Sequence, residues 1–292
     1  MLPSDKRDHF FNGVVIVLLS IFAVIILIPL VFILANSLSH FMEVYQGNVG
    51  LIPRNIDFTI YKLLLTNPLI IRGFLNTILY TVLGTCISLV LTFFAAYPLS
   101  RKDFKHRNFF SFLFLITMFV SGGMIPTYLV VDALGMKNTI WGFILPGCLS
   151  VWNLMVAKSF LTKSVPWELY EAAKMDGCSD FRAFFQVTLP LSKPIIAIMV
   201  LFYGVGYWNS YFNSLLYLTD STLFPLQRIL SDIIIASDIS SLATGGSLID
   251  QGRMLDAIQY VSIVVSTLPI LLVYPLLSKY IEKGVLLGGI KG

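Results

Sequence analysis

Long apolar runs alternate with short charged segments along most of this chain. Six stretches of about 18 residues or more contain no Asp, Glu, Lys or Arg, and such a length lets a helix cross the hydrocarbon of a bilayer. Helices are the expected form, because backbone groups in lipid must pair within their own segment and the runs lack the alternation of barrel strands. The expected spans are 10–40, 73–100, 108–131, 138–157, 194–219 and 257–278.

Composition supports a membrane protein. Of the 292 residues, 57% are hydrophobic and 12% are charged, whereas soluble domains carry about 25% charge. The first apolar run, at 14–35, is longer than the apolar region of a signal peptide, so we expect it to stay as an uncleaved span. The class is therefore an all-α integral membrane protein of six transmembrane helices.

Basic residues in the loops predict the orientation of the spans. With the N-terminus inside, 14 of the 20 Lys and Arg residues lie in the inner segments. Both termini and the polar segment 158–193 are then cytoplasmic. The net charge of +4 reflects this bias, so a nucleic-acid partner is not expected.

The polar segment between the fourth and fifth spans has the pattern of two helices joined by a turn. Ser164 is the expected cap of a first helix of about three turns that begins at Pro166. Gly177 is expected to end it in the left-handed conformation, and Ser179 to begin the second helix. So short a helix is marginal alone in water, and Trp167 and Tyr170 are suitable anchors for a groove on a soluble partner.

The segment EAAKMDGCSDFRAFFQVTLP resembles the EAA loop of ABC-importer permeases. It carries Glu-Ala-Ala, then Gly four residues after the second Ala, then Leu189-Pro190, and it lies at the matching place between two spans. Three further stretches, GGMIPTYLVVDALGMKNTIWGFILP, LPLSKPIIAIMVLFYGVGYWNSYFNSLLYL and PLLSKYIEKGVLLGGIKG, resemble the carbohydrate-uptake group. They are most similar to the second permease of maltose-type systems, in a subgroup importing complex oligosaccharides.

This resemblance implies a type I ABC-importer permease fold with a cytoplasmic coupling helix between spans 4 and 5. Residues 1–72 would form the first transmembrane helix and outer loop, and residues 73–292 the permease core, with the EAA loop at about 165–190. The residues implied to contact an ATPase subunit are Trp167, Glu168, Tyr170, Glu171, Ala172, Ala173, Asp176 and Gly177.

The resemblance also implies partners and a location. The chain would pair with a second homologous permease as a heterodimer in the bacterial cytoplasmic membrane, surrounded by lipid. Two copies of an ATP-binding subunit would hold ATP and Mg, and an extracellular solute-binding protein would deliver an oligosaccharide. The chain itself has no phosphate-binding Gly-x-x-x-x-Gly-Lys-Ser/Thr loop, so we expect no cofactor in it and no enzymatic activity.

Three alternatives stay open at this stage. The coupling motif is shared among importers, so the solute of an ABC permease could be something other than a sugar. A secondary transporter and a membrane scaffold are less favoured, because neither needs a docking helix at this position. The expected spans hold no Asp, Glu, Lys or Arg, which disfavours an ion-coupled carrier, and no spacing of metal ligands is present.

Aromatic and amide side chains in the spans are candidate sugar contacts. Tyr203 and Tyr207 lie four residues apart on one face of the fifth span. Aromatic faces stack on sugar rings and amides bond hydroxyls, but such residues also hydrogen-bond between helices in membrane bundles. The candidates are Tyr203, Tyr207, Trp208, Asn209 and Asn213, followed by Asn76, Tyr80 and Asn153.

Overall fold

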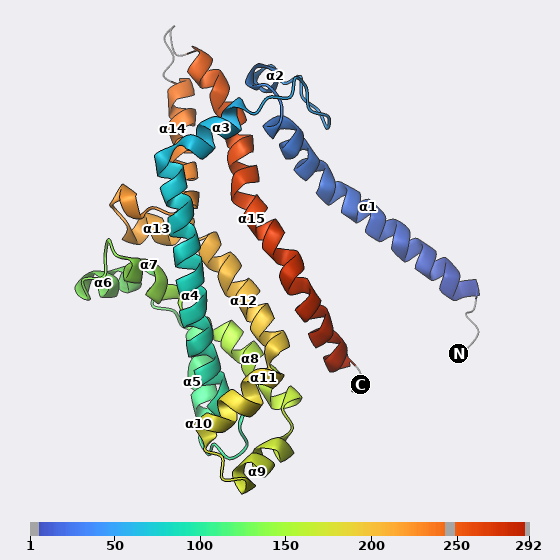
Figure 1. Cartoon of the computed structure of the whole chain (residues 1–292), viewed down its shortest axis with the longest axis vertical. Coiled ribbons are helices and arrows are strands. Elements are labelled where there is room, and N and C mark those ends of the chain that lie inside the picture. Colours follow the sequence, from blue (N-terminus) through green and yellow to red (C-terminus); the bar gives the residue numbers. More distant parts are fainter. Residues whose placement is uncertain (1–5, 243–248, 290–292) are drawn as a thin grey trace. The chain divides into compact units, whose positions relative to one another are not determined.

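The structure, a computed structural model, describes residues 6–242 and 249–289 and is helical over most of them (Figure 1). Within these residues the only β-pairing is an isolated bridge between Ser39 and Ile56. The chain divides into two compact units, residues 1–67 with 230–268, and residues 68–229 with 269–292. The functional division expected at residue 72 stays a prediction, and the two termini, expected to be cytoplasmic, lie outside the described residues.

The first unit gathers the N-terminal helices and part of the last two helices. Ser37 Oγ accepts a hydrogen bond of 2.9 Å from the Tyr61 hydroxyl, and Ser39 Oγ accepts one of 2.9 Å from the backbone of Arg54. The first bond ties α3 to the last residue of α1, and the second ties together two parts of the segment between α1 and α3. The elements are α1 (Lys6–Ser37), α2 (Phe41–Tyr45), α3 (Thr59–Thr66), most of α14 (Leu226–Leu242) and the first part of α15 (Ile249–Gly289).

The second unit is built on α4 (Pro68–Ser100), which packs along α12 (Lys193–Trp208) and α8 (Val151–Ser164). Figure 1 shows the short helices α9 and α10 gathered at the C-terminal end of α4. The other elements of this unit are α5 (Arg107–Phe119), α6 (Met124–Ala133), α7 (Ile140–Ile144), η1 (Leu145–Gly147), α9 (Trp167–Met175), α10 (Asp180–Ala183), the π-helical turn η2 (Phe184–Thr188), α11 (Leu189–Leu191), α13 (Tyr211–Tyr217) and η3 (Ser221–Leu223).

Three described helices are long and apolar enough to cross a membrane by themselves, at Phe10–Ser37, Pro68–Ser100 and Asp256–Pro275. Three further candidates are pairs of helices bent by 110°, 53° and 82°, so the described residues hold up to six spans. The pairs are Arg107–Phe119 with Met124–Ala133, Ile140–Gly147 with Val151–Ser164, and Asp180–Leu191 with Lys193–Trp208.

Three of the expected continuous spans are therefore interrupted. The first break falls at Gly123, whose φ of 86° is open to glycine but strained for other residues. The second follows the 3-10 turn that contains Pro146, a residue that cannot donate a backbone hydrogen bond. The run expected to end at residue 219 ends at Trp208, and α13 follows as a separate helix.

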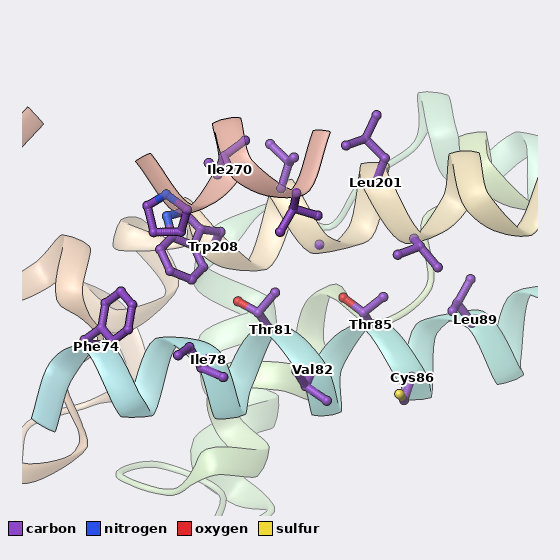
Figure 2. Close-up of a pocket in the computed structure, with 15 residues that line it drawn as sticks. Phe74, Ile78, Thr81, Val82, Thr85, Cys86, Leu89, Leu201, Trp208 and Ile270 are labelled. Carbon is purple, nitrogen blue, oxygen red and sulfur yellow. The ribbon is translucent and has the colours of Figure 1, made fainter. Parts of the chain in front are cut away.

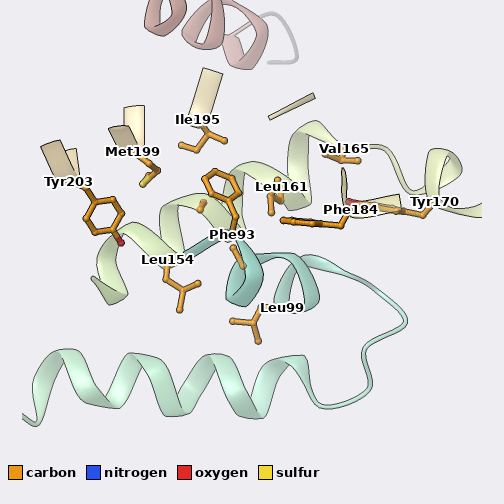
Figure 3. Close-up of a cluster of buried hydrophobic side chains, with 12 residues drawn as sticks. Phe93, Leu99, Leu154, Leu161, Val165, Tyr170, Phe184, Ile195, Met199 and Tyr203 are labelled. Atoms are coloured by element: carbon orange, nitrogen blue, oxygen red, sulfur yellow. The ribbon is translucent and has the colours of Figure 1, made fainter. Parts of the chain in front are cut away.

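One core of buried apolar side chains runs through the second unit from Tyr170 on α9 to Tyr203 on α12 (Figure 3). Phe93 and Leu161 lie between these two tyrosines, so α4 and α8 share the core with α9 and α12. Close packing of this kind transmits displacement instead of absorbing it. The buried members are Phe93, Ala96, Leu99, Leu154, Ala157, Leu161, Val165, Tyr170, Phe184, Ile195, Met199 and Tyr203.

Candidate functional site

Helix α9 begins at Trp167 and has Pro166 as its N-cap, without a side-chain hydrogen bond. The prediction that Ser164 caps this helix is wrong, because α8 continues through Ser164 and the chain turns only at Val165. The second predicted cap is confirmed, since the Ser179 hydroxyl accepts a hydrogen bond from the backbone of Arg182. Helix α9 has nine residues, which is shorter than the three turns expected.

Gly177 ends α9 as predicted. Its φ is 72°, in the left-handed region, and its N–H donates to the carbonyl of Lys174 at 3.1 Å. The N–H of Cys178 reaches back to the carbonyl of Ala173 at 2.9 Å. These two bonds form a Schellman motif, which satisfies the last carbonyls of the helix and fixes the direction in which the chain leaves it.

One side of α9 faces the rest of the second unit. The Tyr170 side chain is buried, and its hydroxyl lies 3.1 Å from Thr188 Oγ1 in the π-helical turn. Burial raises the pKa of the Tyr170 hydroxyl, which therefore stays protonated near neutral pH. Trp167 and Ala173 are half-buried on the same side. This side packs against the second unit and holds the helix in place, and the ATPase contacts expected of Trp167, Tyr170 and Ala173 stay predictions.

The opposite side of α9 is open. Glu168, Ala172 and Met175 recur at the spacing of one helix face, and all three are exposed, Met175 to 89%. Glu171 borders this surface, and its Oε1 accepts a hydrogen bond of 2.8 Å from Trp167 Nε1. We call the surface of Glu168, Glu171, Ala172 and Met175 the outer face of α9; it combines two carboxylates, a methyl group and an uncovered thioether.

Arg101, the residue that follows α4, lies beneath the buried side of α9 and is 7% exposed. Its guanidinium carbon lies 5.1 Å from the ring centre of Tyr170 and 5.8 Å from that of Trp167. Its Nε donates to Asp103 Oδ1 at 2.8 Å, and Nη1 lies 2.9 Å from Asp180 Oδ1. One cation therefore contacts both aromatic rings of α9 and the first residue of α10.

The charge of Arg101 is compensated locally. Nη1 also donates to the Tyr97 hydroxyl at 2.7 Å, and that hydroxyl donates to the backbone carbonyl of Asp180 at 3.1 Å. The hydrogen bonds from Arg101 hold the pKa of the Asp103 carboxyl below its usual value, so the pair is ionised at neutral pH. A buried cation needs such partners, because an unpaired charge in this position is costly.

A cavity of about 710 Å³ lies farther along α12, where it meets the start of α8 and the second part of α15. Four of the predicted sugar contacts line it, namely Tyr203, Tyr207, Asn153 and Asn213. No Asp, Glu, Lys, Arg or His side chain lies in its lining. The other members are Gly147, Ser150, Trp152, Leu201, Phe202, Val205, Gly206, Ser210, Ile270 and Tyr274.

Sequence reasoning missed Trp152, the large ring of this cavity that is 62% exposed. It lies in the first turn of α8, which begins after the Ser150 cap. The available signal was its position directly before Asn153, an aromatic–amide pair at a helix start. We call the cavity of about 710 Å³ that Trp152 lines the neutral cavity.

The hydroxyls of Tyr203 and Tyr207 form hydrogen bonds between helices. The Tyr203 hydroxyl lies 2.7 Å from Thr92 Oγ1, and the Tyr207 hydroxyl lies 3.1 Å from Ser88 Oγ. Both partners belong to α4, so the tyrosines hold α12 to α4 while their rings border the cavity. Packing and cavity lining, which the sequence posed as alternatives, occur together here.

Trp208 lies in a different pocket, of about 510 Å³, formed by α4, α12 and the second part of α15 (Figure 2). Its ring contacts Phe74 edge to face, with the ring centres 5.9 Å apart. The lining is aliphatic and aromatic apart from Thr81, Thr85 and Cys86. Because this wall is so apolar, it offers few hydrogen-bond partners to sugar hydroxyls. The surroundings of Trp208 therefore differ from the neutral cavity, which is lined by two asparagines.

The remaining predicted contacts lie outside both pockets. The amide of Asn76 donates to the carbonyl of Thr222 at 2.9 Å, and the Tyr80 hydroxyl donates to that of Leu223 at 2.8 Å. Both side chains thus fasten η3 to α4. Asn209 is exposed and caps the C-terminal end of α12. Among the described residues no group of three or more His, Cys, Asp or Glu is arranged to hold a metal ion.

Comparison with known proteins places this geometry in a family. A family described as "binding-protein-dependent transport system inner membrane component" matches residues 1–287. Protein LplC of Bacillus subtilis (strain 168) is 40% identical over 292 residues, covering 100% of this chain and 98% of LplC. The polygalacturonan/rhamnogalacturonan transport system permease protein YtcP of the same organism is 39% identical over 291 residues, covering 98% of this chain and 100% of YtcP.

A solved structure has the same fold. One chain in the crystal structure of a bacterial ABC transporter involved in the import of the acidic polysaccharide alginate superposes with a TM-score of 0.84. The two sequences are 30% identical, and the match covers 96% of this chain and 99% of that one.

Proposed function

The chain belongs to the family of binding-protein-dependent transport system inner membrane components, and we propose from this membership that it takes up an oligosaccharide as one permease subunit of an ATP-driven importer. The solute would arrive on an extracellular binding protein, and a second homologous permease would complete the pore as a heterodimer. Both termini and α9 would face the cytoplasm, as the distribution of basic residues indicates.

The outer face of α9 carries this proposal. A short helix whose one side is buried and whose other side exposes Met175 and two carboxylates has the form of a docking surface. An ATP-binding subunit with a basic, apolar-walled groove matches it, and two such subunits would serve the two permeases. ATP and Mg would be held entirely by those subunits, so this chain would act as a transport component without catalysis of its own.

The neutral cavity supports a sugar as the solute. Trp152, Phe202 and Tyr274 line it and are 62%, 48% and 53% exposed, as suits stacking on sugar rings. Asn153 and Asn213 offer amides to hydroxyl groups. The relative is named for polygalacturonan and rhamnogalacturonan transport, and the neighbour is involved in the import of alginate, which agrees with a saccharide as the class of solute.

A substitution on the outer face tests the docking role without disturbing the buried side. Ala172→Arg places a long cation where a small residue permits close approach, and Ser164→Arg adds the same side chain to the exposed end of α8. We expect Ala172→Arg to lower the amount of co-purified ATP-binding subunit about tenfold, since one mismatched charge in an interface costs more than 1.4 kcal/mol. Ser164→Arg should leave it unchanged. Equal recruitment by both variants, each correctly inserted, would refute docking at α9.

A further inference from the structure

Arg101 occupies a position that the proposed docking role does not by itself explain. It follows the last residue of α4, yet its guanidinium lies against Tyr170 and Trp167 of α9 and against Asp180 of α10. We propose that Arg101 is a positioning residue: a rigid joint through which movement of α9 is passed to α4. This inference rests on the proposed function for its direction of force, whereas the joint itself can be tested in the isolated chain.

The chemistry of the joint requires arginine. A guanidinium is flat, so it can donate two in-plane hydrogen bonds to one carboxylate while its faces meet aromatic rings. Here both carboxylate oxygens of Asp103 accept hydrogen bonds from Arg101. The ring centres of Tyr170, Tyr97 and Trp167 all lie within 6 Å of the guanidinium carbon. A lysine would keep the charge but lose both the fork and the flat faces.

The joint is also braced from the side of α5. Arg107, the first residue of α5, donates from Nη1 to the backbone carbonyl of Arg101 at 3.2 Å. The Arg101 backbone is thereby fixed between α4 and α5, and its side chain is fixed by Asp103. With both ends held, a displacement of the two rings of α9 cannot be absorbed by swinging of the arginine side chain.

From Arg101 a continuous series of contacts leads to the neutral cavity. Helix α4 carries Thr92 and Ser88, which are hydrogen-bonded to the hydroxyls of Tyr203 and Tyr207. The rings of both tyrosines line the cavity, and Tyr170 and Tyr203 share one buried core (Figure 3). A shift of α4 driven through Arg101 would therefore move the cavity wall on α12. Contacts of this kind become a coupling route only when energetic coupling is measured.

The test compares Arg101→Lys and Asp103→Asn with Lys102→Gln, a change at an exposed neighbour outside the joint. The first measurement is backbone hydrogen exchange of α9 in the purified, membrane-reconstituted chain without ATP-binding subunits. We expect exchange in α9 to rise about tenfold or more in both joint variants, as loss of a charge-assisted hydrogen bond would produce. Hydrogen exchange around Thr92, inside α4, should stay slow, which would verify that the variants are folded.

The second measurement is the number of solutes imported per ATP hydrolysed by the complete importer in vesicles. Arg101→Lys should keep the ATP-binding subunit, because the outer face of α9 is untouched, and should lower this ratio about tenfold relative to Lys102→Gln. If Arg101→Lys leaves the number of solutes imported per ATP unchanged, or leaves hydrogen exchange in α9 equal to that of the wild type, the proposal that Arg101 is a joint is refuted. If the proposed function is wrong, the result differs: the wild-type chain recruits no ATP-binding subunit, at any rate of hydrogen exchange in α9.

Discussion

The ring of Tyr207 lies against the backbone of Gly84, at the place where α12 packs on α4. A Cβ added at residue 84 would stand 2.6 Å from two atoms of that ring, closer than real Cβ atoms approach. Small residues at helix contacts in membranes permit this close packing. The contact sets the spacing of the two helices beside the neutral cavity.

Gly84→Ala is therefore expected to push α12 away from α4 and to destabilise the protein by about 1–3 kcal/mol, the usual cost of overpacking. Gly204→Ala on α12 is the matched control, since its Cβ would meet Thr85 Oγ1 at an ordinary 3.8 Å. Thermal unfolding in detergent, followed by the circular dichroism of the helices, compares the two. Equal midpoints for Gly84→Ala and wild type would contradict the close contact.

Trp152 on α8 and Trp208 on α12 are expected to affect transport differently. Trp152→Ala removes the exposed ring of the neutral cavity and should raise the solute concentration for half-maximal uptake about tenfold, as loss of a stacked ring worth about 1.4 kcal/mol would. Trp208→Ala empties part of the apolar pocket and should lower stability more than uptake (Figure 2). Uptake kinetics and unfolding midpoints of both variants make the comparison, and a larger transport defect in Trp208→Ala would move the sugar site to that pocket.

Two substitutions at Gly177 separate backbone conformation from side-chain bulk. A Cβ at this position meets nothing within 4 Å, so only the φ of 72° opposes other residues. Gly177→Ala should weaken the end of α9 by about 1–2 kcal/mol, and Gly177→Asn by less, because asparagine tolerates the left-handed region. Recruitment of the ATP-binding subunit should fall in the same order. If alanine and asparagine act alike, the turn at residue 177 does not govern docking.

Much of the membrane architecture was predictable because it depends on local composition. Charge-free runs located the candidate spans, and the glycine at 177 specified a turn that few other residues can adopt. The family expected from the EAA segment is confirmed by the match over residues 1–287. In each case neighbouring residues carried the whole signal.

The bends and the joint at Arg101 were not predictable for a physical reason. A count of apolar residues carries no information on the direction of the chain, so it cannot detect the 110° bend near Gly123. Two partners of Arg101, Tyr97 and Asp103, are close in sequence. The others lie on α9 and α10, which are distant in sequence, and nothing near residue 101 specifies them. Trp152 was missed for the same reason, because the cavity exists only after α8 and α12 have packed.

Met175, with 89% of its surface uncovered, has a consequence for the chain before assembly. A thioether held in water is open to oxidation, and the sulfoxide that results is polar and bulkier. If α9 docks as proposed, a copy of this protein that waits for its partners would gradually lose the apolar contact proposed to recruit them. Balanced synthesis of the subunits, or prompt removal of the surplus, would then protect assembly.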